Sequence, residues 1–214
     1  LKQNYPEYMA PDGENFRGIN AVRVLEEEKK YNIDKVIKAG YDTRLTAFEI
    51  LVPPLIKAFE KNIGLNDSLY SSLKEVMDTL KKWDFRSGET SVATTIAIEW
   101  GEIIMPGIHS IKMPAGENNT VSKAIAFSNT ASANDLLLPL LAAVKELQNK
   151  YGKWQMPWGE INRFQRISND MANKFDDSKP SYPVGFVSSA WGMLPSYSSR
   201  SFADTKKRYG INGN

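Results

Sequence analysis

One apolar pattern constrains the fold of this chain more than any other. Large apolar residues recur at alternating spacings of four and three residues, at Leu69, Leu73, Val76, Leu80 and Trp83. This spacing places them on one face of an α-helix, because the helix completes a turn in about 3.6 residues. The pattern therefore predicts a helix that buries this face in a core, and it favours a mainly α-helical domain.

Similar apolar stripes predict further helices, at residues 16–31, 33–39, 91–105, 120–127 and 136–151, and one more that opens at Asp42 or Thr43 and carries its stripe over residues 45–59. Asn32 stands where a side chain can cap the start of a helix, either Ser132 or Asn134 begins the last one, and Gly152 ends it. Two prolines, Pro53 and Pro54, predict a kink or break inside their helix, because each lacks a backbone donor. For the same reason, Pro106 predicts the end of the helix that begins at Ser91.

The chain changes character after Gly152, where helical periodicity fades. Aromatic residues are spread among Gly, Pro and Ser, at Trp154, Trp158, Phe164, Phe175, Tyr182, Phe186 and Trp191. We expect loops and short strands here, with a strand at 184–191 and either a strand or a helix at 159–167. The predicted division is a helical domain at 1–151, which begins with an extended proline-containing arm, and a loop and short-strand segment at 152–214.

Composition excludes several classes of function. The 214 residues are 42% hydrophobic and 24% charged, which is ordinary for a globular protein. The formal net charge is only +2 and no strong basic block occurs, so nucleic acid is not an expected partner. No cysteine is present, which excludes disulfides, thiolate metal sites and a Cys nucleophile. No apolar run is long enough to predict a membrane span.

The residues alone do not reveal a catalytic set. His109 is the one histidine, in a stretch that reads as a loop, and no acid partner is evident near it. Glu26, Glu27 and Glu28 read as a solvated helix face rather than an acid–base pair. No nucleophile elbow, metal-ligand cluster or phosphate-binding glycine loop is found. The residues by themselves therefore predict a helical globular domain and do not indicate a specific activity.

Four segments, in order, resemble the penicillin acylase family of N-terminal nucleophile hydrolases. They are Phe16-Arg-Gly-Ile-Asn-Ala-Val-Arg-Val-Leu25, Leu80-Lys-Lys-Trp-Asp-Phe-Arg-Ser87, Tyr151-Gly152 with Trp158-Gly-Glu-Ile-Asn-Arg163, and Pro183-Val-Gly185 with Trp191-Gly192. The resemblance covers most of the chain. It implies a helical domain inserted into a four-layered αββα core, with the segment from Gly152 returning toward that core.

The resemblance also implies a mechanism whose nucleophile is not found here. The family's nucleophile is a Ser that becomes a chain N-terminus after self-cleavage, whereas this chain begins with Leu1. Asn4 before Pro6 matches the family's oxyanion-hole Asn poorly in spacing, so we expect its counterpart before Leu1. The chain is accordingly expected to be an internal piece of the β-chain region of a larger acylase, inactive by itself.

Arg17 is the one catalytic residue that the resemblance assigns to this chain. The family has an Arg at this position, which organises the surroundings of the nucleophile and the acyl pocket. A guanidinium suits such a role, because it is always charged and offers several donors in a rigid fork. Arg17 opens the motif, whereas Arg23 falls within the helix, and Arg17 is therefore the preferred candidate. The alternative is an ordinary ion pair at the start of a helix.

Two functional hypotheses follow. The first is part of an amidohydrolase that cleaves an acyl chain from a β-lactam, a homoserine lactone or a similar amine. Its expected partners are the α-chain and the nucleophile-bearing part of the β-chain, and its location is periplasmic or secreted. No cofactor is expected, although calcium, which some relatives bind, would need acidic ligands that the sequence does not place. The second hypothesis is a stand-alone helical binding module, with residues 154–191 as an aromatic contact surface.

Overall fold

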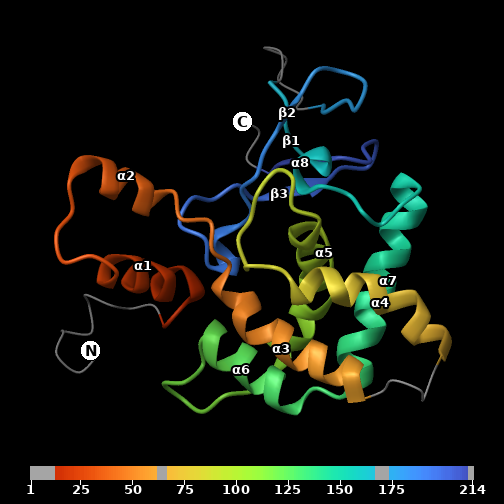
Figure 1. The fold of residues 1–214 in the computed structure, drawn as a ribbon, viewed down its shortest axis with the longest axis horizontal. Coiled ribbons are helices and arrows are strands. Elements are labelled where there is room, and N and C mark those ends of the chain that lie inside the picture. The colour runs from red at the N-terminus through yellow and green to blue at the C-terminus, as the bar shows by residue number, and fades with distance from the viewer. Residues whose placement is uncertain (1–12, 62–66, 167–173, 212–214) are drawn as a thin grey trace.

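The computed structural model describes residues 13–61, 67–166 and 174–211. Its body is a group of helices, and a small sheet lies at one end (Figure 1). Helices dominate and the strands gather near the C-terminus, which confirms the mainly α fold class. Residues 1–12, which contain most of the predicted arm and Asn4, lie outside the described part. Within that part, no helix combines the length and the apolar character needed to cross a bilayer.

Helices α1 (Phe16–Glu26) and α2 (Ile33–Gly40) begin where polar side chains cap them. The side-chain oxygens of Asn15 and Asn32 accept hydrogen bonds from the N–H groups of Gly18 and Lys35. The prediction that the first helix reaches residue 31 is wrong. If the helix continued to residue 31, the carboxylates of residues 26–28 would lie near its C-terminus, where the helix dipole is negative and repels them. These residues are exposed, so burial of their side chains does not offset this repulsion.

Helix α3 (Thr46–Lys61) continues through Pro53 and Pro54 without the break that the sequence allowed. A proline at position 54 cannot donate to the carbonyl of Ile50, four residues earlier. That carbonyl instead accepts a hydrogen bond from the hydroxyl of Ser128, on the neighbouring α6, at 3.2 Å. The expected apolar stripe is confirmed, since Leu45, Phe48, Val52, Leu55 and Phe59 are all buried.

Helix α4 (Asp67–Lys81) carries the pattern that led to the helical prediction, and Leu73, Val76 and Leu80 are buried as expected. Helix α5 (Val92–Ser110) begins next to Ser91, where its start was predicted, but the prediction that it ends at Pro106 is wrong. Ile104 and Ile108 are buried on either side of Pro106. Burying two such side chains contributes about 3–6 kcal/mol, which offsets the roughly 3 kcal/mol cost of an interior proline.

Helices α6 (Thr120–Thr130) and α7 (Ala133–Tyr151) complete the helical body. Ser132 and Asp135 form a reciprocal capping box at the start of α7. Gly152 ends α7 with φ of 79°, a left-handed conformation that glycine adopts at little cost. The predicted start and end of this helix are confirmed.

The C-terminal segment contains α8 (Trp158–Ile161), η3 (Ser189–Trp191) and four short strands, which are β1 (Asn162–Phe164), β2 (Tyr182–Pro183), β3 (Ser199–Ser201) and β4 (Arg208–Gly210). The sheet order is β2-β1-β4-β3, with β1 and β4 parallel. The predicted strand at 184–191 is wrong. Buried Asn162 holds this stretch instead, because its Nδ2 donates to the carbonyls of Val184 at 2.7 Å and Phe186 at 2.9 Å.

The tryptophans of the C-terminal segment belong to the core. Trp154, Trp158 and Trp191 are buried, and they join the same hydrophobic cluster as the helical side chains. These three rings are therefore not part of an exposed aromatic surface on the outside of the molecule. The boundary between residues 151 and 152 stays a prediction, and the cluster contains residues from both sides of it.

Candidate functional site

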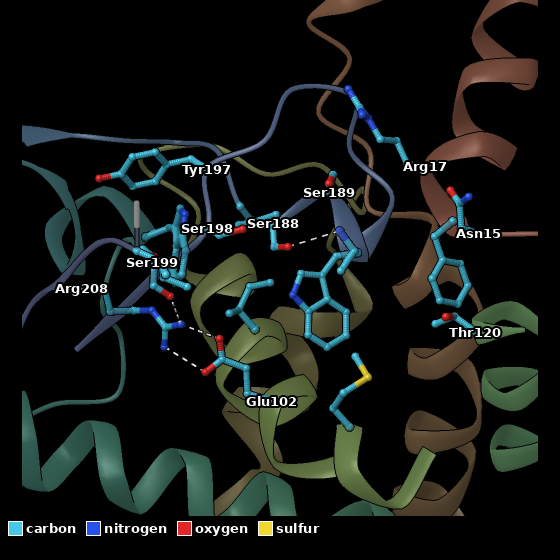
Figure 2. A pocket seen from close by; sticks show the side chains of 18 of the residues that line it. Asn15, Arg17, Glu102, Thr120, Ser188, Ser189, Tyr197, Ser198, Ser199 and Arg208 are labelled. Atoms are coloured by element: carbon cyan, nitrogen blue, oxygen red, sulfur yellow. Dashed lines mark hydrogen bonds and ion pairs between the residues drawn. The ribbon is translucent and has the colours of Figure 1, made fainter. Parts of the chain in front are cut away.

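A cavity of about 560 Å³ opens between the start of α1, helix α5, the η3 loop and the strands β3 and β4 (Figure 2). Its volume lies within the range of small-molecule sites, roughly 300–1,000 Å³. It is lined by Asn15, Phe16, Arg17, Ile98, Glu102, Met105, His109, Thr120, Trp158, residues 187–191, residues 197–199, Arg208 and Ile211. Segments from both ends of the chain thus form one site.

The wall of the cavity is mostly apolar and firmly held. The Trp191 ring stacks on Phe48 with centroids 4.8 Å apart. It also lies over Gly101, where a Cβ would be 2.6 Å from the nearest Trp191 atom. The indole N–H of Trp158 donates to the carbonyl of Phe186 at 3.1 Å. These contacts fix two indole rings in place before any ligand arrives.

Arg17, the predicted catalytic residue, lies at the edge of this cavity (Figure 2). Its side chain is exposed, and its Nε donates to the carbonyl of Leu194 at 3.0 Å. That bond joins α1 to the η3 loop, 177 residues away in sequence. The guanidinium is therefore oriented by the fold rather than by an acidic partner, and its catalytic role stays a prediction.

Arg23, the less favoured candidate, lies away from the cavity and joins α1 to α3. It forms an ion pair with Glu49 at 3.0 Å and donates to the side-chain oxygen of Asn20 at 2.7 Å. Arg44 pairs with the same Glu49 at 2.9 Å. These contacts give Arg23 a structural role.

Asp42 is the centre of a neighbouring polar network. It accepts hydrogen bonds from Asn20 Nδ2 at 3.0 Å, from Arg86 at 2.7 Å and from the N–H of Arg44 at 3.0 Å. Burial alone would raise the pKa of Asp42, but these hydrogen bonds hold the pKa below its ordinary value. Asp42 thus stays ionised, and it joins α1 to the turn that follows α4.

An ion cluster that sequence reasoning missed forms the floor of the cavity. Arg208 pairs with Glu99 at 2.9 Å and with Glu102 at 2.5 Å, and it donates to the carbonyl of Ser199 at 2.8 Å. The Arg208 side chain is 8% exposed, whereas that of Glu102 is 46% exposed. Burial raises the pKa of Glu99, although the cation of Arg208 acts in the opposite direction.

The one available sequence signal for this cluster was the spacing of its two acids. Residues three positions apart lie on the same face of a helix, so Glu99 and Glu102 were bound to be neighbours. Nothing in the local sequence linked them to Arg208, which is 109 positions after Glu99.

His109 lines the cavity from the last turn of α5, so its expected place in a loop is wrong. Its carbonyl accepts a hydrogen bond from Lys123 at 3.1 Å. In the part of the chain that the structure describes, its ring is not paired with a carboxylate or with a hydroxyl of the cavity wall. The described geometry therefore offers a binding cavity, and it does not assemble a nucleophile with a base.

Two of the serines in the cavity wall bond to other protein groups through their hydroxyls. Ser188 accepts from the N–H of Ala190 at 3.3 Å, and Ser199 donates to the side-chain oxygen of Asn162 at 2.5 Å. Within residues 13–61, 67–166 and 174–211, no group of three or more acidic or histidine side chains is placed to hold a metal ion.

Comparison with protein families places this geometry in context. A family model described as penicillin amidase matches residues 1–186, which include α1 with Arg17, the entire helical body and β1 and β2. No curated protein matches the chain.

Proposed function

Since the chain belongs to the penicillin amidase family and is thereby part of an acylase-like hydrolase, we propose that this hydrolase cleaves a linear acyl amide, such as a β-lactam side chain or an acyl-homoserine lactone. The observation that carries the proposal is the family match over residues 1–186. Arg17 lies within the matched range, at the edge of a preformed cavity.

The proposed reaction uses a nucleophile that is not among these 214 residues. The hydroxyl of an N-terminal Ser attacks the amide carbonyl, while the α-amino group of the same Ser takes the proton and passes it to the leaving amine. Hydrogen-bond donors hold the oxyanion that develops. Water then cleaves the acyl-enzyme ester and releases the acid. The 214-residue chain alone is inactive on this proposal.

Arg17 supplies the contribution of this chain to the reaction. Its Nε is engaged by the carbonyl of Leu194, so the plane of the guanidinium is set before substrate binds. Among the described residues, its terminal nitrogens have no hydrogen-bond partner, and they remain available to organise the neighbourhood of the nucleophile. A preoriented cation of this kind acts without reorganisation at the moment of reaction.

The test is Arg17→Ala in the full-length enzyme, with Arg166→Ala as the matched control. Arg166 is also an exposed arginine, and it does not line the cavity. We expect Arg17→Ala to lower kcat by about 100-fold, the loss typical of a single electrostatic group, while the protein still folds. Arg166→Ala should retain normal kcat. Normal turnover in Arg17→Ala would remove this residue from the mechanism.

The remaining parts of the proposal concern partners and location. The partners are the α-chain and the nucleophile-bearing part of the β-chain, together with a small acylated amine as substrate. The location is periplasmic or secreted. Fractionation of cells that produce the full-length enzyme tests the location, and purification through a tag on the present chain tests the subunits.

A further inference from the structure

We propose that the cavity between α1, α5 and η3 binds a small organic cation, namely a protonated primary amine that carries an apolar aryl or alkyl body. The inference concerns binding alone and goes beyond the hydrolase activity, so it does not depend on the proposed function. It rests on the charges at the floor of the cavity, on the aromatic rings of its wall and on its size.

The floor presents a carboxylate rather than a cation. Glu102 is 46% exposed at the cavity, whereas Arg208 behind it is 8% exposed. The guanidinium already donates to Glu99, Glu102 and the carbonyl of Ser199. Two carboxylates share this one cation, and each Glu102 oxygen accepts one hydrogen bond from it, which leaves further lone pairs that can accept from a ligand. An ammonium group with three donors complements this floor.

An anion finds no comparable partner at the floor. The Nε of Arg208 lacks a hydrogen-bond partner within the described structure, but it is buried from solvent, so a ligand in the cavity does not reach it. An anionic head group would also lie beside Glu102 and be repelled by it. Arg17 lies at the cavity edge, away from Glu102 (Figure 2). The charged group that a ligand meets at the floor of the cavity is therefore Glu102.

The aromatic wall favours the same ligand. Four aromatic residues line the same cavity as Glu102, namely Phe16, Trp158, Trp191 and Tyr197. Cations are attracted to the faces of aromatic rings, and tryptophan gives the strongest attraction. The site already contains one such pair, because the guanidinium carbon of Arg208 lies 5.7 Å from the centroid of Trp158. The same rings provide apolar surface for the body of the amine.

The volume of about 560 Å³ sets the size of the ligand. Sites of this size enclose small organic molecules and bury most of their surface. Ile98 and Met105 extend the apolar wall along α5, one turn before and one turn after Glu102. A single ammonium group on an aryl-alkyl body fills such a space better than a hydrated inorganic cation, which would leave the apolar wall uncovered.

The test compares two probes of similar shape and opposite charge, 3-phenylpropylammonium and 3-phenylpropanoate. Each is titrated calorimetrically into the 214-residue chain at neutral pH. We expect the cation to bind at least about tenfold more tightly than the anion. Equal affinities, tighter binding of the anion or no binding of the cation up to millimolar concentration would overturn the proposal.

Variants locate the binding. Glu102→Gln should weaken binding of the cation by about tenfold or more, whereas Glu146→Gln, at an exposed position on α7, should leave it unchanged. Met105→Lys changes no residue of the ion cluster and places a positive charge in the cavity wall one turn from Glu102, so it should abolish cation binding even if Glu102→Gln proves unstable. Unchanged binding of the cation in folded Met105→Lys protein would refute the site, whatever the enzyme hydrolyses.

Discussion

Gly192 determines how the η3 loop closes against α3, and its replacement by Ala tests that packing. Its φ is 114°, a conformation that residues with a Cβ rarely adopt. A Cβ built on Gly192 would lie 2.0 Å from the hydroxyl oxygen of Thr46 and 2.6 Å from the Thr46 backbone nitrogen. The hydroxyl cannot simply turn away, because it donates to the carbonyl of Phe16 at 2.8 Å.

Two terms determine the expected loss of stability. Holding a non-glycine residue in such a conformation costs about 1–3 kcal/mol. Forcing one extra carbon into a packed site costs roughly 1–3 kcal/mol more. We therefore expect Gly192→Ala to lower the free energy of unfolding by about 4 kcal/mol, a large part of the total for a domain of ordinary stability.

Alanine substitutions at two other glycines separate the cost of the backbone conformation from the cost of the close contact, when stability is measured by urea unfolding. Gly152 also has positive φ, at 79°, but a Cβ there would meet nothing within 4 Å, so Gly152→Ala should cost only about 1 kcal/mol. Gly40 has open space and no positive φ, so Gly40→Ala should change stability by less than about 1 kcal/mol. A Gly192→Ala loss equal to that of Gly152→Ala would refute the close contact with Thr46.

Three further substitutions probe other parts of the fold by urea unfolding. Asn162→Ala removes two hydrogen bonds to loop carbonyls and one from Ser199, and it should cost about 3 kcal/mol; a loss below about 1 kcal/mol would contradict its role. Ser132→Ala removes the capping box of α7 and should cost about 1 kcal/mol, with no loss expected if the cap were irrelevant. The pKa of Asp42 is lower in the folded protein than its ordinary value of 3.8. The ionised carboxylate therefore stabilises the fold at pH values above 3.8, and this stabilisation is lost as the pH falls through the folded-state pKa. Asp42→Asn should therefore be less stable at neutral pH and lose less stability than the parent on acidification below about pH 4, whereas parallel pH profiles would contradict this pKa shift.

Local periodicity predicted the helices well, because neighbouring turns of one helix share a face. The stripe from Leu73 to Leu80 identified a buried face directly, and Ser132 and Gly152 marked the limits of α7. The errors arose where distant contacts override a local rule. Pro54 was expected to disrupt α3, yet the hydroxyl of Ser128 in another helix satisfies the carbonyl that this proline leaves free.

The candidate site was predictable only at Arg17, and there through family resemblance rather than through periodicity. The remainder depends on contacts between segments far apart in the chain. Arg86 reaches Asp42 across 44 positions, and Arg208 reaches Glu102 across 106. No local pattern encodes such pairings, because short strands and loops in the C-terminal segment determine where Arg208 lies.

Amide hydrolysis by the full-length enzyme tests the central claim most directly. Chromogenic anilides with a range of acyl chains are supplied to the full-length enzyme and, separately, to the 214-residue chain, and the release of amine is recorded. The account predicts release of amine by the full-length enzyme, with an acyl group found by mass spectrometry on an N-terminal Ser, and none by the 214-residue chain. Absence of hydrolysis across the panel, or hydrolysis by the 214-residue chain itself, would contradict it.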